Sequence, residues 1–141
     1  SWMGISRPRG RANDGTFSHN SSGNWLSPSW DSIATNVGSV FGAGSGNMTA
    51  TTGGFWLVGG GCTFASNATG ARGLMLSSSA NGGGTVHAQH FLPSQSLAVG
   101  GTIMTMVQLS GSATVHLSLF QGSGGTLSIT NAHMWAVWVT T

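Results

Sequence analysis

Charged side chains are almost absent from this sequence. Its 141 residues include no Lys and no Glu, and charged residues make up 4% of the total, against roughly 25% in an ordinary soluble domain. A lone molecule with so little surface charge has poor colloidal stability. The scarcity therefore favours a protein whose surface is covered by other protein in an assembled particle.

The missing residue types also exclude several functions. The two aspartates, Asp14 and Asp31, lie seventeen residues apart, so paired carboxylates for acid–base catalysis are not expected. A chain without Lys cannot supply the lysine of a nucleotide-binding loop, and a net charge of +2 is too small to neutralise nucleic-acid phosphates. No apolar run approaches the roughly 20 residues of a membrane-spanning helix. We expect no enzyme, no cofactor, and neither a nucleic-acid nor a membrane partner.

Thiol and imidazole groups are few and scattered. The single cysteine, Cys62, permits no internal disulfide, and its apolar surroundings predict a buried structural thiol. His87 and His90 are three residues apart, a spacing that points them to opposite faces of a strand. His116 and His133 have no partner at ligand spacing, although copies of either gathered on a threefold axis would form a metal or anion site. We expect no metal site within one chain.

The first 32 residues differ in pattern from the rest. They are rich in Arg, Asn, Ser, Gly and Pro and show no period of 3.6 or 2. This pattern predicts a partly irregular arm, residues 1–32, that is either solvated or lies on a neighbouring subunit. The candidate anchoring residues are its aromatic and basic side chains, namely Trp2, Arg7, Arg9, Arg11, Trp25 and Trp30.

From residue 33 onward, short β-rich runs alternate with Gly, Ser and Asn turns. Many short strands at this spacing are typical of a β-sandwich or barrel. The predicted strands are 33–41, 47–52, 54–65, 72–78, 85–92, 95–99, 102–110, 114–121 and 132–140. Within 54–65, Gly59-Gly60-Gly61 predicts either a bulge or the close approach of another backbone.

Two predicted strands are apolar on both faces. In 102–110, Met104 and Met106 oppose Ile103 and Val107, and 132–140 is apolar on both sides as well. An antiparallel strand needs only one apolar face, so the second face predicts burial by another subunit. Arg72, the one charge in this part of the chain, bonds either its own loop carbonyls or a neighbouring subunit. The candidate interface residues are Met104, Met106, Met134, Trp138 and Arg72.

Several of these segments, taken in order, resemble the C1q/TNF-like domain. They are Gly53-Gly54-Phe55-Trp56-Leu57-Val58, Cys62-Thr63-Phe64, the turn Asn67-Ala68-Thr69-Gly70-Ala71-Arg72, and Leu97-Ala98-Val99-Gly100-Gly101-Thr102-Ile103, followed by the closing runs 107–111, 127–129 and 134–138. The resemblance is greatest to variants in bacteriophage structural proteins. It implies a jelly-roll sandwich of about ten antiparallel strands over 33–141, assembled as a homotrimer. Because both aspartates lie upstream of that region, the calcium site of some relatives is not expected.

The composition and the resemblance together predict a trimeric capsid decoration or cement protein on a phage head. Its partners would be copies of itself and the major capsid protein or another virion protein, with residues 1–32 as the anchor. Arg7–Arg11 is followed by polar residues and not by the apolar run of a secretory signal, so synthesis in the host cytoplasm is expected. The alternative is a fibre or tail tip that binds a receptor or carbohydrate through Trp25, Trp30 or Trp56.

Overall fold

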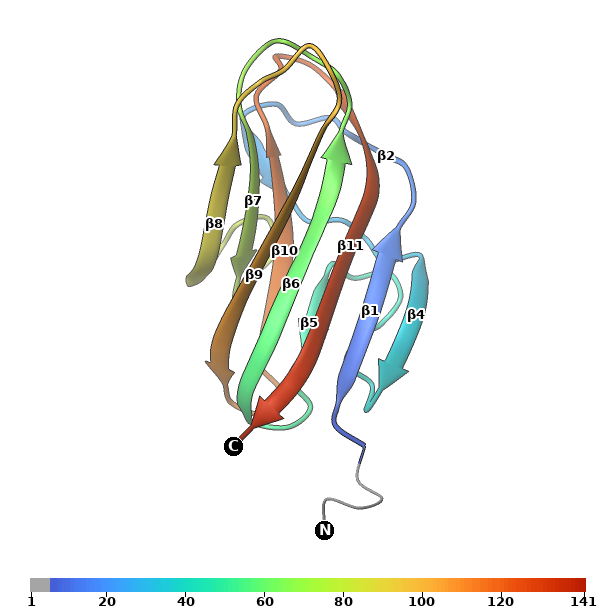
Figure 1. Ribbon diagram of the computed structural model, residues 1–141, viewed down its shortest axis with the longest axis vertical. Coiled ribbons are helices and arrows are strands. Elements are labelled where there is room, and N and C mark those ends of the chain that lie inside the picture. Colours follow the sequence, from blue (N-terminus) through green and yellow to red (C-terminus); the bar gives the residue numbers. More distant parts are fainter. Residues whose placement is uncertain (1–5) are drawn as a thin grey trace.

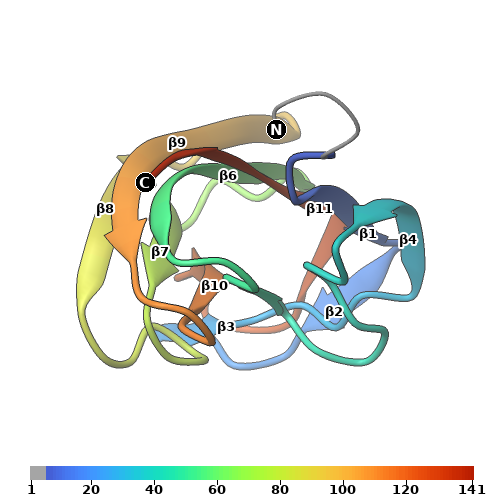
Figure 2. The ribbon, with the colours of Figure 1, turned by 90° about the horizontal axis from the view of Figure 1, so that it is seen from below.

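The computed structural model describes residues 6–141, which form two antiparallel β-sheets packed face to face. Figure 1 shows the long strands running along the molecule, and Figure 2 shows the two sheets enclosing the interior. The all-β jelly-roll prediction is confirmed, with eleven strands in the described part of the chain. No helix among residues 6–141 is long and apolar enough to cross a membrane.

The first sheet has six strands in the order β4-β1-β11-β6-β9, and β2 pairs with β11 beside this path. Its strands are β1 (Arg9–Asp14), β2 (Phe17–His19), β4 (Ser32–Val37), β6 (Gly54–Phe64), β9 (Val99–Leu109) and β11 (Leu127–Thr140). The second sheet has five strands in the order β3-β10-β7-β8, and β5 also pairs with β10. Its strands are β3 (Asn24–Leu26), β5 (Asn47–Thr49), β7 (Arg72–Ser77), β8 (Val86–Leu92) and β10 (Thr114–Gln121).

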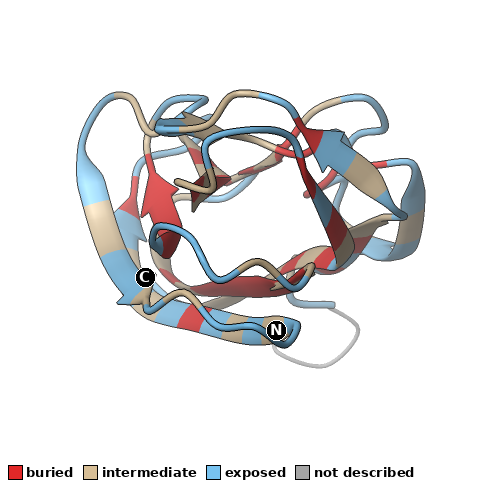
Figure 3. Ribbon diagram, turned by 90° about the horizontal axis from the view of Figure 1, so that it is seen from above, coloured by how far each residue is buried: buried red, intermediate tan, exposed pale blue. Residues whose placement is uncertain are grey.

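The core lies between the sheets and is built by alternation along the strands. On β10, Val115, Leu117 and Leu119 are fully buried, as their period of two predicts. Trp56 and Phe64 of β6 belong to the same buried cluster. Figure 3 shows the buried residues on the strands that line the interior, whereas much of β9 and β8 faces solvent. Each sheet therefore has an inner face that packs in the core and an outer face that can contact other molecules.

Residues 9–26 belong to the jelly roll and not to an arm outside it. β1 pairs with β11 along its whole length and with β4 on its other side, so residues 9–32 are not separated from the rest of the sandwich. The inward residues of β1 are Gly10 and Ala12, and a Cβ at Gly10 would lie 2.6 Å from the Phe41 ring. Because the inward residues are so small, β1 shows no alternation of large apolar side chains, and its sequence therefore does not predict a strand.

One predicted strand is also displaced. The run 95–99 is not a separate strand, because Gln95 makes only an isolated bridge to Asn67 and regular pairing begins at Val99. From there β9 pairs with β6 without interruption as far as Leu109. Trp2 lies outside the described residues, so the prediction for it stays as stated.

Candidate subunit interface

The outer face of the six-stranded sheet carries a band of apolar side chains. Leu57 of β6 lies directly opposite Met106 of β9 on one side and Val137 of β11 on the other. One row further along, Gly59 lies between Met104 and Trp135. Because opposed residues in an antiparallel pair share a face, all these side chains point away from the core. We call Phe55, Leu57, Met104, Met106, Trp135 and Val137 the apolar patch.

Two members of the apolar patch are unusually open to solvent. Met104 is 61% exposed and Met106 is 57% exposed, whereas their neighbours Ile103 and Leu109 on the same strand are buried. The prediction that β9 has two apolar faces is therefore confirmed in its geometry. Phe55 and Leu57 were not among the sequence candidates, although they alternate with the buried Trp56 and could have been found from that pattern.

Glycines in β6 allow large side chains to lie on the apolar patch. A Cβ at Gly59 would overlap the Trp135 indole, and one at Gly61 would lie 3.2 Å from Cε1 of His133. The register of β6 with β9 is unbroken here, so neither glycine marks a bulge against β9. Against β11 the register shifts between Thr130 and His133, next to Gly61. A Cβ at Gly60 or Gly61 would also lie 2.5 Å from a backbone carbonyl, that of His133 or Gly101, so the predicted close backbone approach is made within the same chain.

Arginines border the apolar patch along β1. Arg9 and Arg11 lie opposite Val137 and Trp135, on the same outer face. The Arg7 guanidinium lies 5.9 Å from the centre of the Trp138 ring, within cation–π range, and its Nη1 donates to the carbonyl of Val139 at 3.2 Å. Arg9 and Arg11 therefore form a stripe beside the apolar patch, whereas Arg7 lies against Trp138 at the end of the sandwich.

Two predicted interface residues do not face outward. Met134 has no exposed surface, because it follows the inward face of β11 into the core. Trp138 lies on that inward face too, at the end of the sandwich, where it is partly buried and its Nε1 donates to the Gly53 carbonyl at 3.1 Å. Sequence alternation identifies the two faces of a strand but not which of them meets the core, since both are apolar in β11.

Arg72 is likewise buried, with 1% of its surface exposed. Its guanidinium donates to the carbonyls of Asn67 (2.7 Å), Thr69 (2.9 Å), Gly70 and Ala71. Burial lowers its pKa. Of the two sequence interpretations, the structure matches the one in which Arg72 bonds its own loop, and its side chain is not available to a neighbouring subunit.

Of the tryptophans predicted to make surface contacts, Trp30 and Trp56 are buried in the core and Trp25 is partly exposed. Trp30 is 1% exposed and packs edge-on to Phe41 in the core, so it cannot anchor the chain to another protein. Trp56 has no exposed surface, and its Nε1 donates to the Thr52 carbonyl, which removes it from the candidate sugar contacts. Trp25 is partly exposed, and it lies on the outer face of the other sheet.

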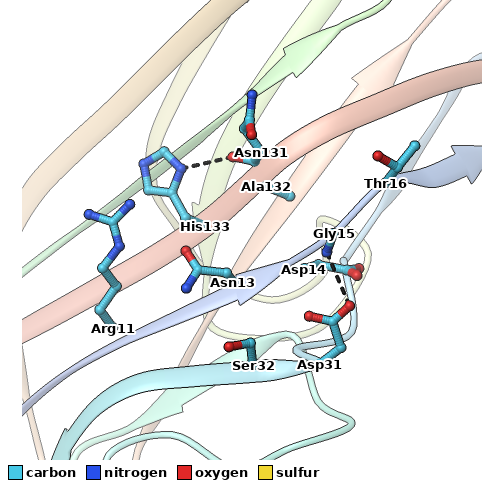
Figure 4. A pocket seen from close by; sticks show the side chains of 10 residues that line it. All are labelled: Arg11, Asn13, Asp14, Gly15, Thr16, Asp31, Ser32, Asn131, Ala132 and His133. Carbon is cyan, nitrogen blue, oxygen red and sulfur yellow. Dashed lines mark hydrogen bonds between the residues drawn. The ribbon is translucent and has the colours of Figure 1, made fainter.

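A groove of about 560 Å³ lies beyond the apolar patch, at the ends of β1 and β4 (Figure 4). Asp14 and Asp31 meet there although they are distant in sequence: the Ser29 amide donates to Asp14 and the Gly15 amide to Asp31. Burial and the neighbouring Asp31 charge raise the pKa of Asp14. The separation of seventeen residues in the sequence therefore does not keep the two carboxylates apart in space, since the pairing of β1 with β4 brings them together. The expectation that they do not serve acid–base catalysis stays a prediction.

His133 forms one wall of this groove, and its Nδ1 donates to the Asn131 carbonyl at 2.9 Å. Asn131 has a positive φ of 55° at the register shift in β11, which turns the strand toward the groove. Among residues 6–141, no group of three or more His, Cys, Asp or Glu side chains is placed to hold a metal ion. Burial raises the pKa of the nearby Cys62 thiol to about 12, so this thiol stays protonated and unreactive at neutral pH.

Two antiparallel sheets packed face to face in this order form a jelly-roll sandwich. Neither a protein-family model nor a curated protein matches the sequence. Solved structures do match the fold. The globular domain of zebrafish complement 1qA protein is 11% identical, with a TM-score of 0.66 over 94% of this chain and 97% of that one. Murine APRIL at pH 5.0 is 11% identical with a TM-score of 0.71, over 95% and 100%.

A third similar structure is the PRD1 vertex protein P5. It is 16% identical to this chain, with a TM-score of 0.68 over 97% of this chain and 99% of that one. The predicted resemblance to C1q/TNF-like domains is thereby confirmed at the level of the fold.

Proposed function

We propose that this chain is a structural protein of a phage particle, in which it acts as a homotrimeric capsid decoration or cement protein without enzymatic activity. Its apolar patch would be the contact between subunits. Its particle contact would be with the major capsid protein or another virion protein, after synthesis in the host cytoplasm. The likeness to PRD1 vertex protein P5 supports a phage structural role, and the scarcity of charge supports a surface covered by protein.

The exposure of Met104 and Met106 carries this proposal. Burying an exposed Met side chain contributes about 1.5–3 kcal/mol, and each subunit offers two of them beside Phe55, Leu57 and Val137. A monomer would leave this whole apolar band in water, and large exposed apolar patches mark contact sites. Association through the band would remove it from solvent in every subunit.

Attachment to the particle would then stabilise the shell by mass action, because binding to the assembled state alone shifts the equilibrium toward it. Arg9 and Arg11 border the apolar patch and are exposed, so they would reach an acidic capsid surface from the rim of the trimer. Removing residues 1–30 does not test this role, since β1 to β3 are part of both sheets. Point substitutions do.

The first test is the oligomeric state of Met104→Glu/Met106→Glu. We expect the wild type to have three times the 14.3 kDa chain mass by light scattering, and the double variant to be monomeric at micromolar concentration, because a subunit contact would bury unpaired charges. The matched control is Leu97→Glu, which adds charge at the exposed Leu97 (73%) in a loop away from the apolar patch, and it should stay trimeric. A monomeric wild type, or an unchanged double variant, contradicts the proposal.

The second test measures binding to phage heads. We expect the wild-type chain to copurify with intact virions, and Arg9→Gln/Arg11→Gln to stay trimeric while binding heads at least tenfold more weakly, with a smaller loss at high salt, where exposed charges are screened. Thr35→Gln, on β4 opposite Arg11, is the control and should bind normally. Equal binding by the arginine variant, or loss of the trimer together with binding, would remove the anchoring role of these arginines.

A further inference from the structure

Three aromatic rings meet on the outer face of the five-stranded sheet. One row of opposed residues crosses four strands: Phe91 of β8, Gly73 of β7, Phe120 of β10 and Trp25 of β3. The rings of Trp25 and Phe120 are centred 5.4 Å apart, those of Trp25 and Phe91 5.7 Å, and those of Phe91 and Phe120 5.9 Å. We call these three residues the aromatic triad.

Glycines on two sides hold the aromatic triad low on the sheet. A Cβ at Gly73 would lie 2.9 Å from Cη2 of Trp25 and 3.1 Å from the Phe91 ring. From the turn after β7, a Cβ at Gly82 would lie 2.8 Å from Cγ of Trp25. The rings are therefore positioned before any ligand arrives, which lowers the entropic cost of binding. They still face solvent: Phe91 is 51% exposed, and Trp25 and Phe120 are partly exposed.

The row of residues next to the aromatic triad holds Gln89, Met75 and Ser118, none of which is charged. Gln89, two residues before Phe91 on the same face of β8, is exposed, and its amide makes no hydrogen bond within residues 6–141. The indole Nε1 of Trp25 likewise makes no hydrogen bond within residues 6–141. The one Arg in the five strands of this sheet is Arg72, which is buried, and they contain no Asp. A nucleic acid, whose binding depends on phosphate neutralisation, does not fit such a surface.

We propose that the aromatic triad binds a neutral saccharide. An aromatic face carries partial negative charge, which attracts the polarised C–H groups on the apolar face of a sugar ring. Phe91, the most exposed of the three aromatic rings, would stack against the sugar ring, with Trp25 tilted by 56° beside it, while Gln89 and the indole N–H would bond its hydroxyls. The site goes beyond the proposed virion function and does not depend on it, because β3 and β10 lie across the interior from β6 and β9 (Figure 2).

The test is binding of the full chain to a densely printed array of neutral hexose and N-acetylhexosamine oligosaccharides, with multivalent display to compensate for weak single sites. We expect binding by the wild type, at least tenfold weaker binding by Phe91→Ala, and unchanged binding by Leu97→Ala, which removes a more exposed apolar side chain elsewhere. Circular dichroism should show that both variants are folded. If no glycan binds, or if Phe91→Ala binds equally well, the sugar assignment is wrong.

A second readout places the sugar on the aromatic triad. The best glycan from the array should change the tryptophan fluorescence of the wild type, and Trp25→Phe should abolish that change while the other tryptophans remain. Met104→Glu/Met106→Glu should bind the free glycan normally, so failure of the trimer and failure of the sugar site can be told apart. Loss of head binding by Phe91→Ala without any glycan binding would show that the triad contacts protein instead.

Discussion

On the outer face of each sheet, an aromatic ring lies over a glycine of a neighbouring strand, but the surrounding side chains differ. On the six-stranded sheet the Trp135 indole lies over Gly59, and on the five-stranded sheet the aromatic triad lies over Gly73. Around Trp135 the neighbours are flexible or branched aliphatic side chains such as Met104 and Leu57, with arginines along the border. Around the triad the next row of residues is Gln89, Met75 and Ser118, with no arginine. The comparison teaches that a glycine on the neighbouring strand lets an aromatic ring lie close to the sheet. The side chains around that ring then determine which kind of partner can bind there.

The largest effect is expected from removing Arg72, which holds the 67–71 turn beside the five-stranded sheet. Arg72→Met removes the donor to the carbonyls of Asn67, Thr69 and Gly70, and a hydrogen bond from a charged group contributes about 1.5–3 kcal/mol. We expect the free energy of unfolding to fall by about 3 kcal/mol or more in urea titrations. Arg9→Met, at an exposed arginine of the other sheet, should change it by less than about 0.5 kcal/mol. Equal effects would contradict the role of the Arg72 hydrogen bonds.

The next largest effect is a difference in stability between alanine substitutions at the two glycines that lie beneath aromatic rings. Gly59→Ala introduces a Cβ that overlaps Trp135 and approaches the Ile103 carbonyl to 2.9 Å, and such overpacking costs about 1–3 kcal/mol. Gly73→Ala meets only ring edges of the partly exposed Trp25 and Phe91, which can shift, so its cost should be below about 1 kcal/mol. Urea denaturation of both variants measures the difference. A larger loss for Gly73→Ala would mean that the aromatic triad is the more rigid platform.

Acid should weaken the two sheets unequally. Burial lowers the pKa values of His87 and His116, and the buried Nδ1 of His116 has no hydrogen-bond partner within the described residues. Because burial favours their neutral forms, the stability that these histidines contribute is fully present above their unfolded pKa of about 6.5 and is lost as the pH falls from that value through their lowered folded pKa. We expect His116→Gln to flatten this pH dependence, measured by thermal unfolding between pH 8 and 5. Gln89→Ala, at an exposed position of β8 that does not titrate, should leave it unchanged.

The smallest effect is expected in the groove of the six-stranded sheet, and it has the opposite sign. Because the pKa of Asp14 is raised, its charge destabilises the fold above that pKa, and the penalty is relieved as the pH falls toward the unfolded value of about 3.9. Asp14→Asn should slightly increase the melting temperature at pH 7, since an amide oxygen still accepts from the Ser29 amide. A decrease would show that the charge of Asp14 is used, for instance by a bound cation, and Asp31→Asn is the matched comparison.

The sequence predicted those strands in which side-chain size alternates. Val115, Leu117 and Leu119 indicate both the strand β10 and its buried face, and Met104 and Met106 indicate the second face of β9. β1 could not be found in this way, because Gly10 and Ala12 occupy its inward positions and Phe41, from elsewhere in the chain, fills the space above them.

The sites depended on pairings that the sequence does not reveal. Asp14 and Asp31 meet only because β1 pairs with β4, and the aromatic triad needs four strands in register. The one local signal of the triad was Phe120, which breaks the alternation of β10. For Met134 the pattern correctly identified the residues on the same face of β11, but it placed that face at the subunit interface, whereas it lies in the core. Both faces of β11 are apolar, so only packing decides between them.

The position of β11 has a consequence for how the chain folds. This strand is synthesised after the other ten, yet it lies at the centre of its sheet, between β1 and β6, and also pairs with β2. Until it is made, β1 has no partner on that side and β6 presents an open edge. Such distant pairings are slow to form, and open edges invite association with other chains. We therefore expect β11 to close the sheet late in folding, and a chain truncated before residue 127 to lack the strand that joins β1 to β6.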